Sequence, residues 1–370
     1  MKLLTQICRW LLGCTLIFSG LIKLNDPYGF SYKLKEYFEV FATDFGDYWH
    51  LFIPYSLYFA FAICTLEIVL GVAILLNYRV KSMLWVTFSL LLFFAFLTFY
   101  SAYFDKVKEC GCFGDFIKFS PWESFCKDLF LLLLLLILLI NQNKLSPAFS
   151  NLVSNFIVGA TIVLAFFGGG YSIQHLPYMD FRPYAVGKNI KTEMQPEEEP
   201  LFVYKMEKGG KEYQFKKYPT DTSFKYKGYK VLNPEKSQPK VTDYQIWNEE
   251  GDYTDSSLVG TKLFIIIKDA KVALYSASSL KHLEKISKLV NNLGKTDIKP
   301  IVLTASPTQQ IEELRHEVQL AAPYYYMDDV QLKTMIRANI GLILIENGTI
   351  KGKWHQNDVP TLKAIKLVQN

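Results

Sequence analysis

Two cysteines separated by a single glycine, Cys110 and Cys112, are the residues with the clearest chemical potential in this chain. Two thiols at this spacing can close into a small, strained disulfide or act as a dithiol, and Gly111 gives the backbone the freedom that such a loop needs. A strained, accessible disulfide is oxidising and exchanges readily, so at a membrane surface the pair could pass electrons to a lipid-soluble quinone. Metal binding and an inert pair are the alternatives. Metal is disfavoured because only Cys126 could add another thiol, and that cysteine could otherwise resolve a mixed disulfide with Cys112.

Glu67 is the second candidate, because it lies inside a long apolar run. A carboxylate in the membrane interior is costly unless it is paired or protonated, so such a residue marks a functional site by default. We expect it to carry a proton or to contact a quinone. The alternative is a neutral acid that is hydrogen-bonded to a neighbouring helix, with Thr65 of its own turn and Tyr58 as candidate partners.

Long apolar runs must position both the cysteine pair and Glu67. A run of about 20 apolar residues is long enough to cross a bilayer core of about 30 Å as a helix. The sequence predicts five such spans, at about 3–22, 52–76, 83–104, 122–140 and 152–173. Tyr28 to Phe45 carries apolar residues at spacings of three and four with charges between them, which predicts an amphipathic helix at the membrane surface. The first run shows no obvious cleavage site, so we expect a retained span and not a signal peptide.

Five spans place the cysteine loop, Asp105 to Pro121, on the same side of the membrane as the C-terminal half, because two spans separate them. Lys and Arg are no rarer in the short loops of one side than of the other, so charge does not decide which side this is. The net charge of +5 is small and scattered, which argues against nucleic-acid binding. All six cysteines precede residue 127, which excludes a disulfide framework in the C-terminal half.

The C-terminal half has an ordinary soluble composition. Leu201 to Phe215 is predicted to form two strands around a Gly-Gly turn, with further strands near 229–232 and 244–247. After Gly260 the pattern becomes β-α-β-α-β-β-α, with the first β-α-β unit parallel and right-handed, which is the order of a thioredoxin-like domain. Its predicted strands are 263–267, 301–303, 342–345 and 349–354, and its predicted helices are 279–293, 307–320 and one after Pro360. The predicted fold class is therefore an α-helical polytopic membrane domain, with a four-helix-bundle core, joined to an α/β thioredoxin-like soluble domain.

The thioredoxin-like half lacks the active site of that fold. A Cys-x-x-Cys normally follows the first core strand, at a helix N-terminus whose dipole lowers a thiol pKa. Here that place begins Lys268-Asp269-Ala270, and Ile340 stands where the fold usually has a proline. Residues 241–370 resemble the TlpA and peroxiredoxin-like branch with a degenerate site. The resemblance implies a domain that docks a partner and does not itself exchange disulfides.

Residues 1–140 resemble the DoxX-like, MauE-type membrane family. The resemblance is carried by Phe18 to Pro27 at the end of the first span, by Glu67, and by the loop Cys110-Gly111-Cys112-Phe113-Gly114. It implies a four-helix unit associated with thiol–disulfide or quinone-linked redox metabolism. It also implies that Cys110 and Cys112 are the redox pair, and that their loop faces the periplasm from a bacterial inner membrane.

The sequence divides the chain into a four-span domain (1–145), a fifth helix (146–177), a β-rich linker (178–240) and a thioredoxin-like domain (241–370). Two hypotheses for its function follow. The first is a thiol–disulfide and quinone-linked redox component with Cys110, Cys112 and Glu67 as its site residues. A quinone is the one cofactor it suggests, and its expected partners are the bilayer and a periplasmic or membrane protein. The second hypothesis is a non-catalytic membrane scaffold or assembly subunit whose periplasmic domain binds protein partners.

Overall fold

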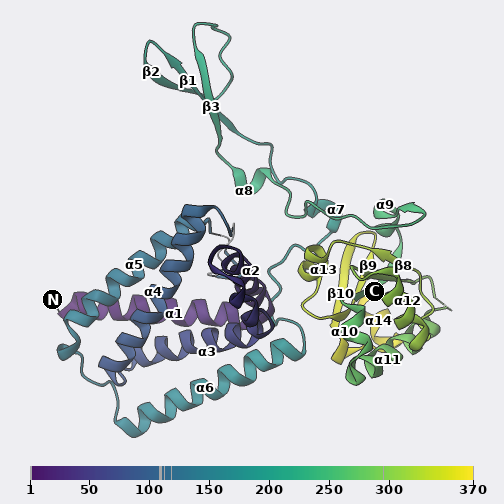
Figure 1. Cartoon of the computed structure of the whole chain (residues 1–370), viewed down its shortest axis with the longest axis horizontal. Helices are drawn as coiled ribbons and strands as arrows, with labels where there is room; N and C mark the ends of the chain where they lie inside the picture. The colour runs from purple at the N-terminus through teal and green to yellow at the C-terminus, as the bar shows by residue number, and fades with distance from the viewer. Residues whose placement is uncertain (1, 108–110, 112, 118, 295, 370) are drawn as a thin grey trace. The chain divides into compact units, whose positions relative to one another are not determined.

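The computed structural model describes residues 2–107, 111, 113–117, 119–294 and 296–369 (Figure 1). They fall into two compact units, the helical unit (Met1–Phe181) and the sheet unit (Arg182–Asn370). Cys110 and Cys112 lie outside the described residues.

The helical unit contains six long helices and two short 3-10 helices within its described residues. They are α1 (Lys2–Asn25), α2 (Pro27–Phe45), η1 (Asp47–Tyr55), α3 (Ser56–Leu75), α4 (Val80–Phe104), α5 (Pro121–Ile140), η2 (Gln142–Lys144) and α6 (Asn151–Gln174). Four segments are long and apolar enough to cross a membrane: Leu3–Asn25, Asp47–Leu75, Val80–Phe104 and Asn151–Gln174. The predicted polytopic membrane domain is therefore confirmed.

The fourth predicted span corresponds to α5, which is a less uniform helix. Its first turns carry Glu123, Lys127 and Asp128, whereas Leu129 to Ile140 is entirely apolar. Ser120 begins the helix with a capping box, because its side chain accepts from the Glu123 amide while the Glu123 carboxylate accepts from the Ser120 amide. These three charges explain why α5 is not counted with those four segments, although its 20 residues would reach across about 30 Å.

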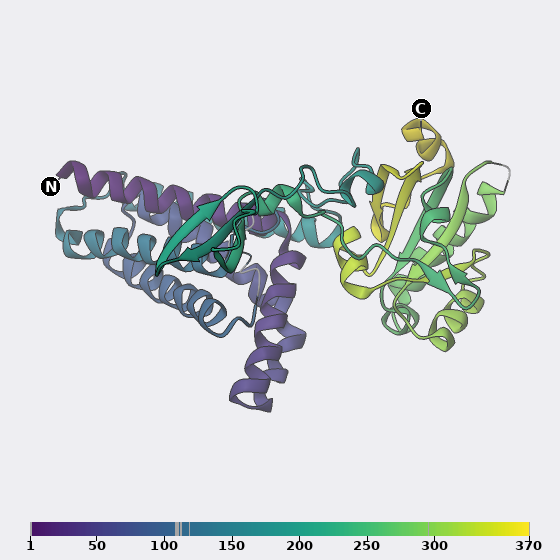
Figure 2. The ribbon, with the colours of Figure 1, turned by 90° about the horizontal axis from the view of Figure 1, so that it is seen from above.

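The predicted amphipathic helix is α2, and it runs across the long axes of α1 and α3 (Figures 1 and 2). Asp26 caps its N-terminus by accepting a 2.9 Å hydrogen bond from the Gly29 amide, and Pro27 occupies the first helical position. Its buried side chains include Phe30, Leu34, Tyr37 and Phe41. A helix with one apolar face, lying across the end of a bundle, suits the membrane–water interface.

Glycines bring α1 and α3 into close contact. A Cβ atom on Gly71 would lie 2.7 Å from the Gly13 carbonyl oxygen, and one on Gly20 would lie 2.6 Å from Ile68 Cγ1. Small residues of this kind let membrane helices approach through their backbones. The contact fixes how α1 and α3 are aligned along their axes, and therefore which of their side chains face each other.

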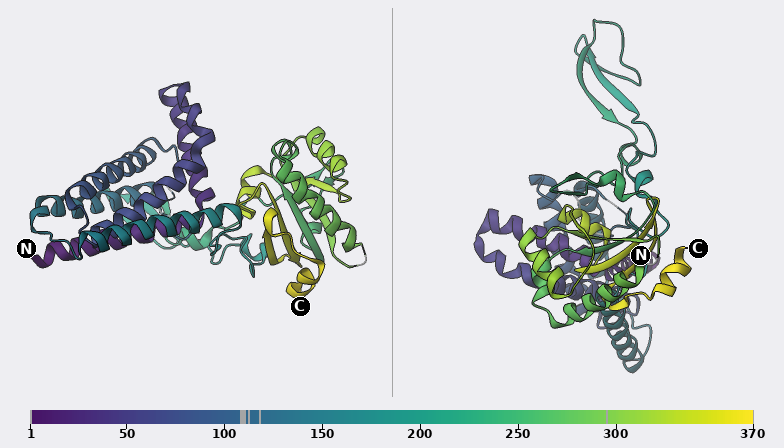
Figure 3. Two further views of the ribbon diagram at one scale, coloured as in Figure 1. Left: turned by 90° about the horizontal axis from the view of Figure 1, so that it is seen from below. Right: turned by 90° about the vertical axis from the view of Figure 1, so that its right-hand side faces the viewer.

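The sheet unit is built on a seven-stranded sheet in the order β10-β9-β6-β7-β8-β4-β5 (Figure 3). Its strands are β4 (Trp247–Asn248), β5 (Gly251–Asp252), β6 (Thr261–Ile267), β7 (Lys299–Thr304), β8 (Tyr324–Tyr326), β9 (Ile340–Glu346) and β10 (Thr349–His355). Strands β6 and β7 are parallel, while β9 is antiparallel to both β6 and β10. This β7-β6-β9-β10 core confirms the predicted thioredoxin-like topology.

Helices connect the strands of this unit in the predicted order. They are α9 (Thr254–Ser257), α10 (Ala270–Leu274), α11 (Ala277–Leu293), α12 (Thr308–Glu317), α13 (Asp329–Met335), η3 (Gln356–Asp358) and α14 (Leu362–Gln369). Leu263, Ile265 and Ile267 of β6 share one hydrophobic core with α11 and α12. The strand predicted at 244–247 is largely absent: β4 begins only at Trp247, and Tyr244 is instead a buried side chain.

A separate three-stranded sheet precedes this domain, in the order β2-β1-β3. Its strands are β1 (Phe202–Lys208), β2 (Lys211–Phe215) and β3 (Lys225–Val231), flanked by the short helices α7 (Ile190–Glu193) and α8 (Pro234–Ser237). Gly209 and Gly210 have φ of +61° and +76°, which confirms the predicted Gly-Gly hairpin.

Candidate functional site

A pocket lies among helices α1 to α5 of the helical unit. It holds about 550 Å³ of space not filled by atoms, part of it open to the surroundings. Its apolar wall consists of Leu16, Phe30, Leu34, Leu91, Phe94, Leu97, Phe113 and Leu131. Its polar wall consists of Thr15, Ser19, Lys23, Tyr37, Glu67, Thr98, Lys127 and Asp128. Two acids and two lysines thus share one largely apolar pocket.

Lys23 of α1 and Glu67 of α3 form a buried ion pair at this pocket. Their Nζ and Oε1 atoms are 2.6 Å apart, and the side chains are only 3% and 2% exposed. Ser19 Oγ, one turn before Lys23, donates to Glu67 Oε2 at 3.4 Å. The ammonium group also lies 5.1 and 4.7 Å from the ring centres of Phe30 and Phe94, within range of cation–π attraction. Each charge is tolerated here because the other one is present.

Lys127 and Asp128 of α5 form a second ion pair at the same pocket, with 2.6 Å between Nζ and Oδ1. Asp128 is fully buried, and Thr98 Oγ1 of α4 donates a 3.0 Å hydrogen bond to its other oxygen. Lys127 Nζ lies 5.6 Å from the ring centre of Phe113. The pocket therefore contains two carboxylates, each beside an ammonium group, in surroundings of low polarity.

The sequence predicted Glu67 as a buried acid bonded to a neighbouring helix, but the two candidate partners that it named are wrong. Thr65 Oγ1 has no hydrogen-bond partner within the described part of the chain, and Tyr58 is 73% exposed. Lys23 and Asp128 were missed because each lies near the end of a predicted span, where charges normally reach water. The spacing of Ser19 and Lys23 was an available signal, since residues four apart lie on one helix face.

The cysteine pair is outside the described residues, but its neighbours in the chain are not. Phe113, which follows Cys112, lines the pocket and lies 5.7 Å between ring centres from Phe18. Gly111 has φ of +66°, as the glycine between two cysteines was expected to allow. The cysteine loop and Glu67, which the sequence presents as separate candidates, therefore meet at one pocket through Phe113.

The other four cysteines are free thiols. Cys8 and Cys64 are buried in the helix bundle, where they act as small packing residues, whereas Cys14 and Cys126 are exposed.

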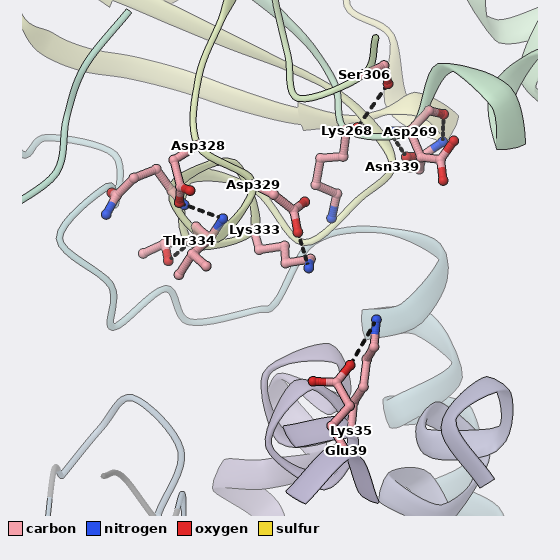
Figure 4. A network of polar contacts seen from close by, with 12 residues as sticks. Lys35, Glu39, Lys268, Asp269, Ser306, Asp328, Asp329, Lys333, Thr334 and Asn339 are labelled. Atoms are coloured by element: carbon pink, nitrogen blue, oxygen red, sulfur yellow. Dashed lines mark hydrogen bonds and ion pairs between the residues drawn. The ribbon is translucent and has the colours of Figure 1, made fainter. Parts of the chain in front are cut away.

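The degenerate site of the sheet unit is closed by its own hydrogen bonds (Figure 4). Asp269 caps α10 by accepting from the Val272 amide at 2.9 Å, and the Ala270 amide donates to Ser306 Oγ at 2.8 Å. Asn339 completes the closure, because its Oδ1 accepts from the Asp269 amide and its Nδ2 donates to the Asp269 carbonyl. The amides that would stabilise a thiolate in an active thioredoxin site are thus engaged by protein oxygens.

Lys268 occupies the first position of this degenerate site, at the end of β6. Burial, and then the positive charge of Arg337, lower the pKa of its amine to about 7. Lys333, Asp329 and Arg182 also act on it, and Lys333 forms an ion pair with Asp329. The site therefore holds a cluster of basic groups in place of a dithiol.

Comparisons with known proteins bear on both units. Residues 1–141 match the family model of the methylamine utilisation protein MauE. A candidate protein disulfide isomerase from Bacteroides thetaiotaomicron, solved in solution, is similar at 18% identity over 35% of this chain and 83% of its own, with a TM-score of 0.27. No curated protein matches the chain. The strand order carries the fold assignment of the sheet unit. Residues 1–141 are thus similar to the MauE membrane family, and in the same chain they are joined to a domain of thioredoxin-like topology.

Proposed function

We propose that the protein is a membrane thiol–disulfide redox component whose Cys110–Cys112 pair exchanges electrons with a quinone at the pocket of the helical unit. The observation that carries the proposal is the shared pocket. Glu67 lines it, and so does Phe113, the residue that follows Cys112. Glu67 and the cysteine loop are each candidates on chemical grounds that do not depend on this proximity.

The pocket offers what a quinone headgroup requires. Aromatic side chains, Phe30, Phe94 and Phe113, supply flat apolar contacts. The ammonium group of Lys23 has three N–H donors, so it can bind a carbonyl oxygen as well as Glu67. Most of the unfilled space lies in gaps between side chains or is open to the surroundings, so entry of a ring requires some of these aromatic side chains to move.

The proton balance gives the two carboxylates a role. Joining the thiols of Cys110 and Cys112 into a disulfide releases two electrons and two protons, and a bound quinone supplies an acceptor for both. Glu67 and Asp128 can each hold a proton in transit, and Lys23 and Lys127 stabilise their charged forms between transfers.

The sheet unit docks the client in this proposal. Its place for a Cys-x-x-Cys is taken by Lys268 and Asp269, and the surrounding amides are engaged by Ser306 and Asn339. The proposed location is a bacterial inner membrane, with the cysteine loop and the sheet unit in the periplasm. This orientation rests on the family resemblance and on counting α5 as a crossing.

The test is the redox state of Cys110 and Cys112 in intact membranes. Thiols are trapped with acid and counted with a mass tag under denaturing conditions, where Cys8, Cys14, Cys64 and Cys126 give a constant background. We expect the pair to gain and lose tags with quinone supply, and Cys112→Ser to abolish the change. Glu67→Gln should slow re-oxidation by added quinone about tenfold or more, whereas Glu123→Gln, an exposed acid of α5, should not.

A pair that stays reduced, or stays bridged, under every condition would exclude this function. The scaffold hypothesis would then take its place, and the closed site around Asp269 already favours it for the sheet unit. In that case Cys112→Ser would have no phenotype, and cross-linking would recover one partner protein in a fixed ratio to this chain.

A further inference from the structure

The three-stranded sheet belongs to an arm, residues 194–240, whose two ends are joined at its base. Val241 donates its amide to the Glu193 carbonyl at 3.0 Å, and Leu232 donates to Leu201 at 2.8 Å. Ion pairs between Lys236 and Glu198 and between Lys240 and Glu197 add to this closure. The arm is therefore a defined excursion of the chain with a structure of its own.

The basic excess of the whole protein is concentrated in this sheet. Residues 202–231 contain eight lysines and three acids, a net charge of +5, which equals the net charge of all 370 residues. The rest of the chain therefore has equal numbers of basic and acidic side chains. All eight lysines are exposed. Clustered, exposed lysines attract an anionic surface over about one Debye length.

One face of the same sheet is aromatic. The pairing register places Tyr204 opposite both Phe215 and Tyr229, and Met206 opposite both Tyr213 and Tyr226. These residues share a face because alternate strand positions point the same way. Met206 is buried beneath them, yet Tyr213, Tyr226 and Tyr229 are 42%, 48% and 58% exposed. The other face carries Lys205, Lys230 and Glu207.

The loop from β2 to β3 does not cover this face completely. Phe224 packs edge-on against Tyr213 and Phe215, and Tyr218 packs against Tyr204. Tyr218 is nevertheless 58% exposed, and Lys208 Nζ lies 4.8 Å from the Phe224 ring centre. The surface is thus a set of half-exposed tyrosines bordered by lysines.

We propose that this aromatic face of the arm binds the anionic phospholipid surface of the membrane in which the same chain is anchored. Tyrosines with an apolar body and a polar tip, next to lysines, match the composition that proteins place at a bilayer interface. Only 27 residues separate the end of α6 at Gln174 from Phe202, so the chain keeps the sheet within about 90 Å of the membrane. Such a tether makes the bilayer the anionic partner at highest effective concentration.

The proposal is independent of the cysteine pair and of the pocket. It can be tested with the full-length protein in nanodiscs of phosphatidylcholine alone or mixed with phosphatidylglycerol. The photo-cross-linker p-benzoylphenylalanine replaces Tyr229, and in a separate control it replaces Tyr275 of the sheet unit, which is 79% exposed. Mass spectrometry then identifies what each position captures.

We expect lipid adducts at position 229 to be about fivefold more abundant in the anionic discs, and to fall as salt is raised. Position 275 should show no such dependence. Lys208 and Lys211 lie in register with Tyr204 and Met206, so replacing both by Gln should lower the adduct at position 229. The matched change of Lys281 and Lys285, exposed on α11, should leave it unchanged.

Equal adduct in the two lipid mixtures would overturn the proposal, and so would capture of a protein in place of lipid. The comparison between the two lipid mixtures uses the protein with all its lysines. It therefore tests the proposal even if the lysine variant unfolds. Hydrogen exchange across residues 202–231 reports whether the strands of that variant remain formed.

Discussion

Lys23 and Glu67 show how two charged residues can be buried together although the burial of either one alone would be unfavourable. Either charge alone would lie among leucine and phenylalanine side chains with little access to water. At 2.6 Å the two charges compensate each other, and Ser19 contributes a further hydrogen bond. Ion pairs of this kind seldom add much net stability, but losing one partner leaves the other charge uncompensated.

A double-mutant cycle should reveal this asymmetry. We expect Lys23→Met and Glu67→Leu each to lower the unfolding free energy of the helical unit by about 3–5 kcal/mol. The double variant should lose much less than the sum, because it leaves no unpaired charge. Unfolding in mixed detergent, followed by circular dichroism, gives the values.

The exposed pair Lys35 and Glu39 of α2, drawn in Figure 4, is the control for this cycle. Its atoms are 3.8 Å apart and its side chains are 42% and 53% exposed, so its removal should cost less than about 1 kcal/mol. Strictly additive losses at Lys23 and Glu67 would show that the two side chains do not interact.

Lys268 gives the sheet unit a pH-dependent stability. Its pKa is lowered to about 7 in the folded protein, below the ordinary lysine value near 10.4. Between these two pH values the unfolded chain binds a proton that the folded chain does not, so the unfolding free energy rises with pH. We expect a gain of about 1–3 kcal/mol between about pH 7 and pH 9. Pulse proteolysis of the full-length protein in urea, scored on fragments of the sheet unit, measures it.

Replacing this lysine provides the contrast. Lys268→Met should stabilise the sheet unit near neutral pH and remove the rise between pH 7 and 9. Lys271→Met, an exposed lysine three residues on, should leave the rise intact. A rise of unchanged size in Lys268→Met would assign it to another group.

At this scale the sequence predicts residue types better than partners. Glu67 was identified because a lone acid in an apolar run is unusual, and the absence of cysteine at Lys268 was evident from the strand pattern alone. The pairing of Glu67 with Lys23 was not predictable, because the two residues are 44 positions apart and their meeting depends on the rotation and depth of two helices. The hydrogen bond from Thr98 to Asp128 was not predictable for the same reason, since the two residues belong to different helices.

At the scale of elements, the contact of α1 with α3 sets the level at which Lys23 meets Glu67. Gly13, Gly20 and Gly71 lie along this contact, and a Cβ on Gly71 would also come within 2.7 Å of Ile17 Cγ1. Backbones held this close leave little freedom to slide. The ion pair thus depends on residues that carry no charge themselves.

Alanine at Gly71 should therefore destabilise the helical unit, by about 1–3 kcal/mol, through overpacking against Gly13 and Ile17. Gly159 of α6 is the matched control, because a Cβ there would meet no atom within 4 Å. Gly159→Ala should be neutral or slightly stabilising, since alanine favours helix more than glycine does. Thermal unfolding in detergent compares them, and equal effects at both positions would show that the α1–α3 contact is not tight.

The sequence predicts the boundaries of helices and strands well where the hydrophobic pattern extends over many residues. Helix α11 and strands β6, β9 and β10 lie within about two residues of their predicted positions, which is the usual uncertainty of such boundaries. Short elements were not predictable. Helix α13 has only seven residues, and β4 pairs with β8 through a single residue, Trp247 opposite Tyr326. Such elements exist because of tertiary contacts and not because of local pattern.

At the scale of the whole chain, two units of different composition are joined, and the change of composition near residue 180 is visible in the sequence. Apolar runs predicted the helical unit, and alternating β and α patterns predicted the sheet unit. The arm between them was expected only as a β-rich linker, because its aromatic face becomes evident when the register of β1 with β2 and β3 is known.

The number of membrane crossings decides which parts of the chain share a compartment, and α5 is the element in question. If α5 crosses, the cysteine loop and the sheet unit lie on one side, and the turns after α3 and α5 lie on the other.

In a chain whose six cysteines are replaced by alanine, single cysteines at Lys106, Tyr275, Lys81 and Lys144 report the side of the membrane on which each position lies. An impermeant maleimide applied to sealed cells should label Lys106→Cys and Tyr275→Cys alike, and should spare Lys81→Cys and Lys144→Cys until the membrane is opened. Labelling of Lys106→Cys and Tyr275→Cys from opposite sides would mean that α5 does not cross, because the cysteine loop and the sheet unit would then be separated by α6 alone.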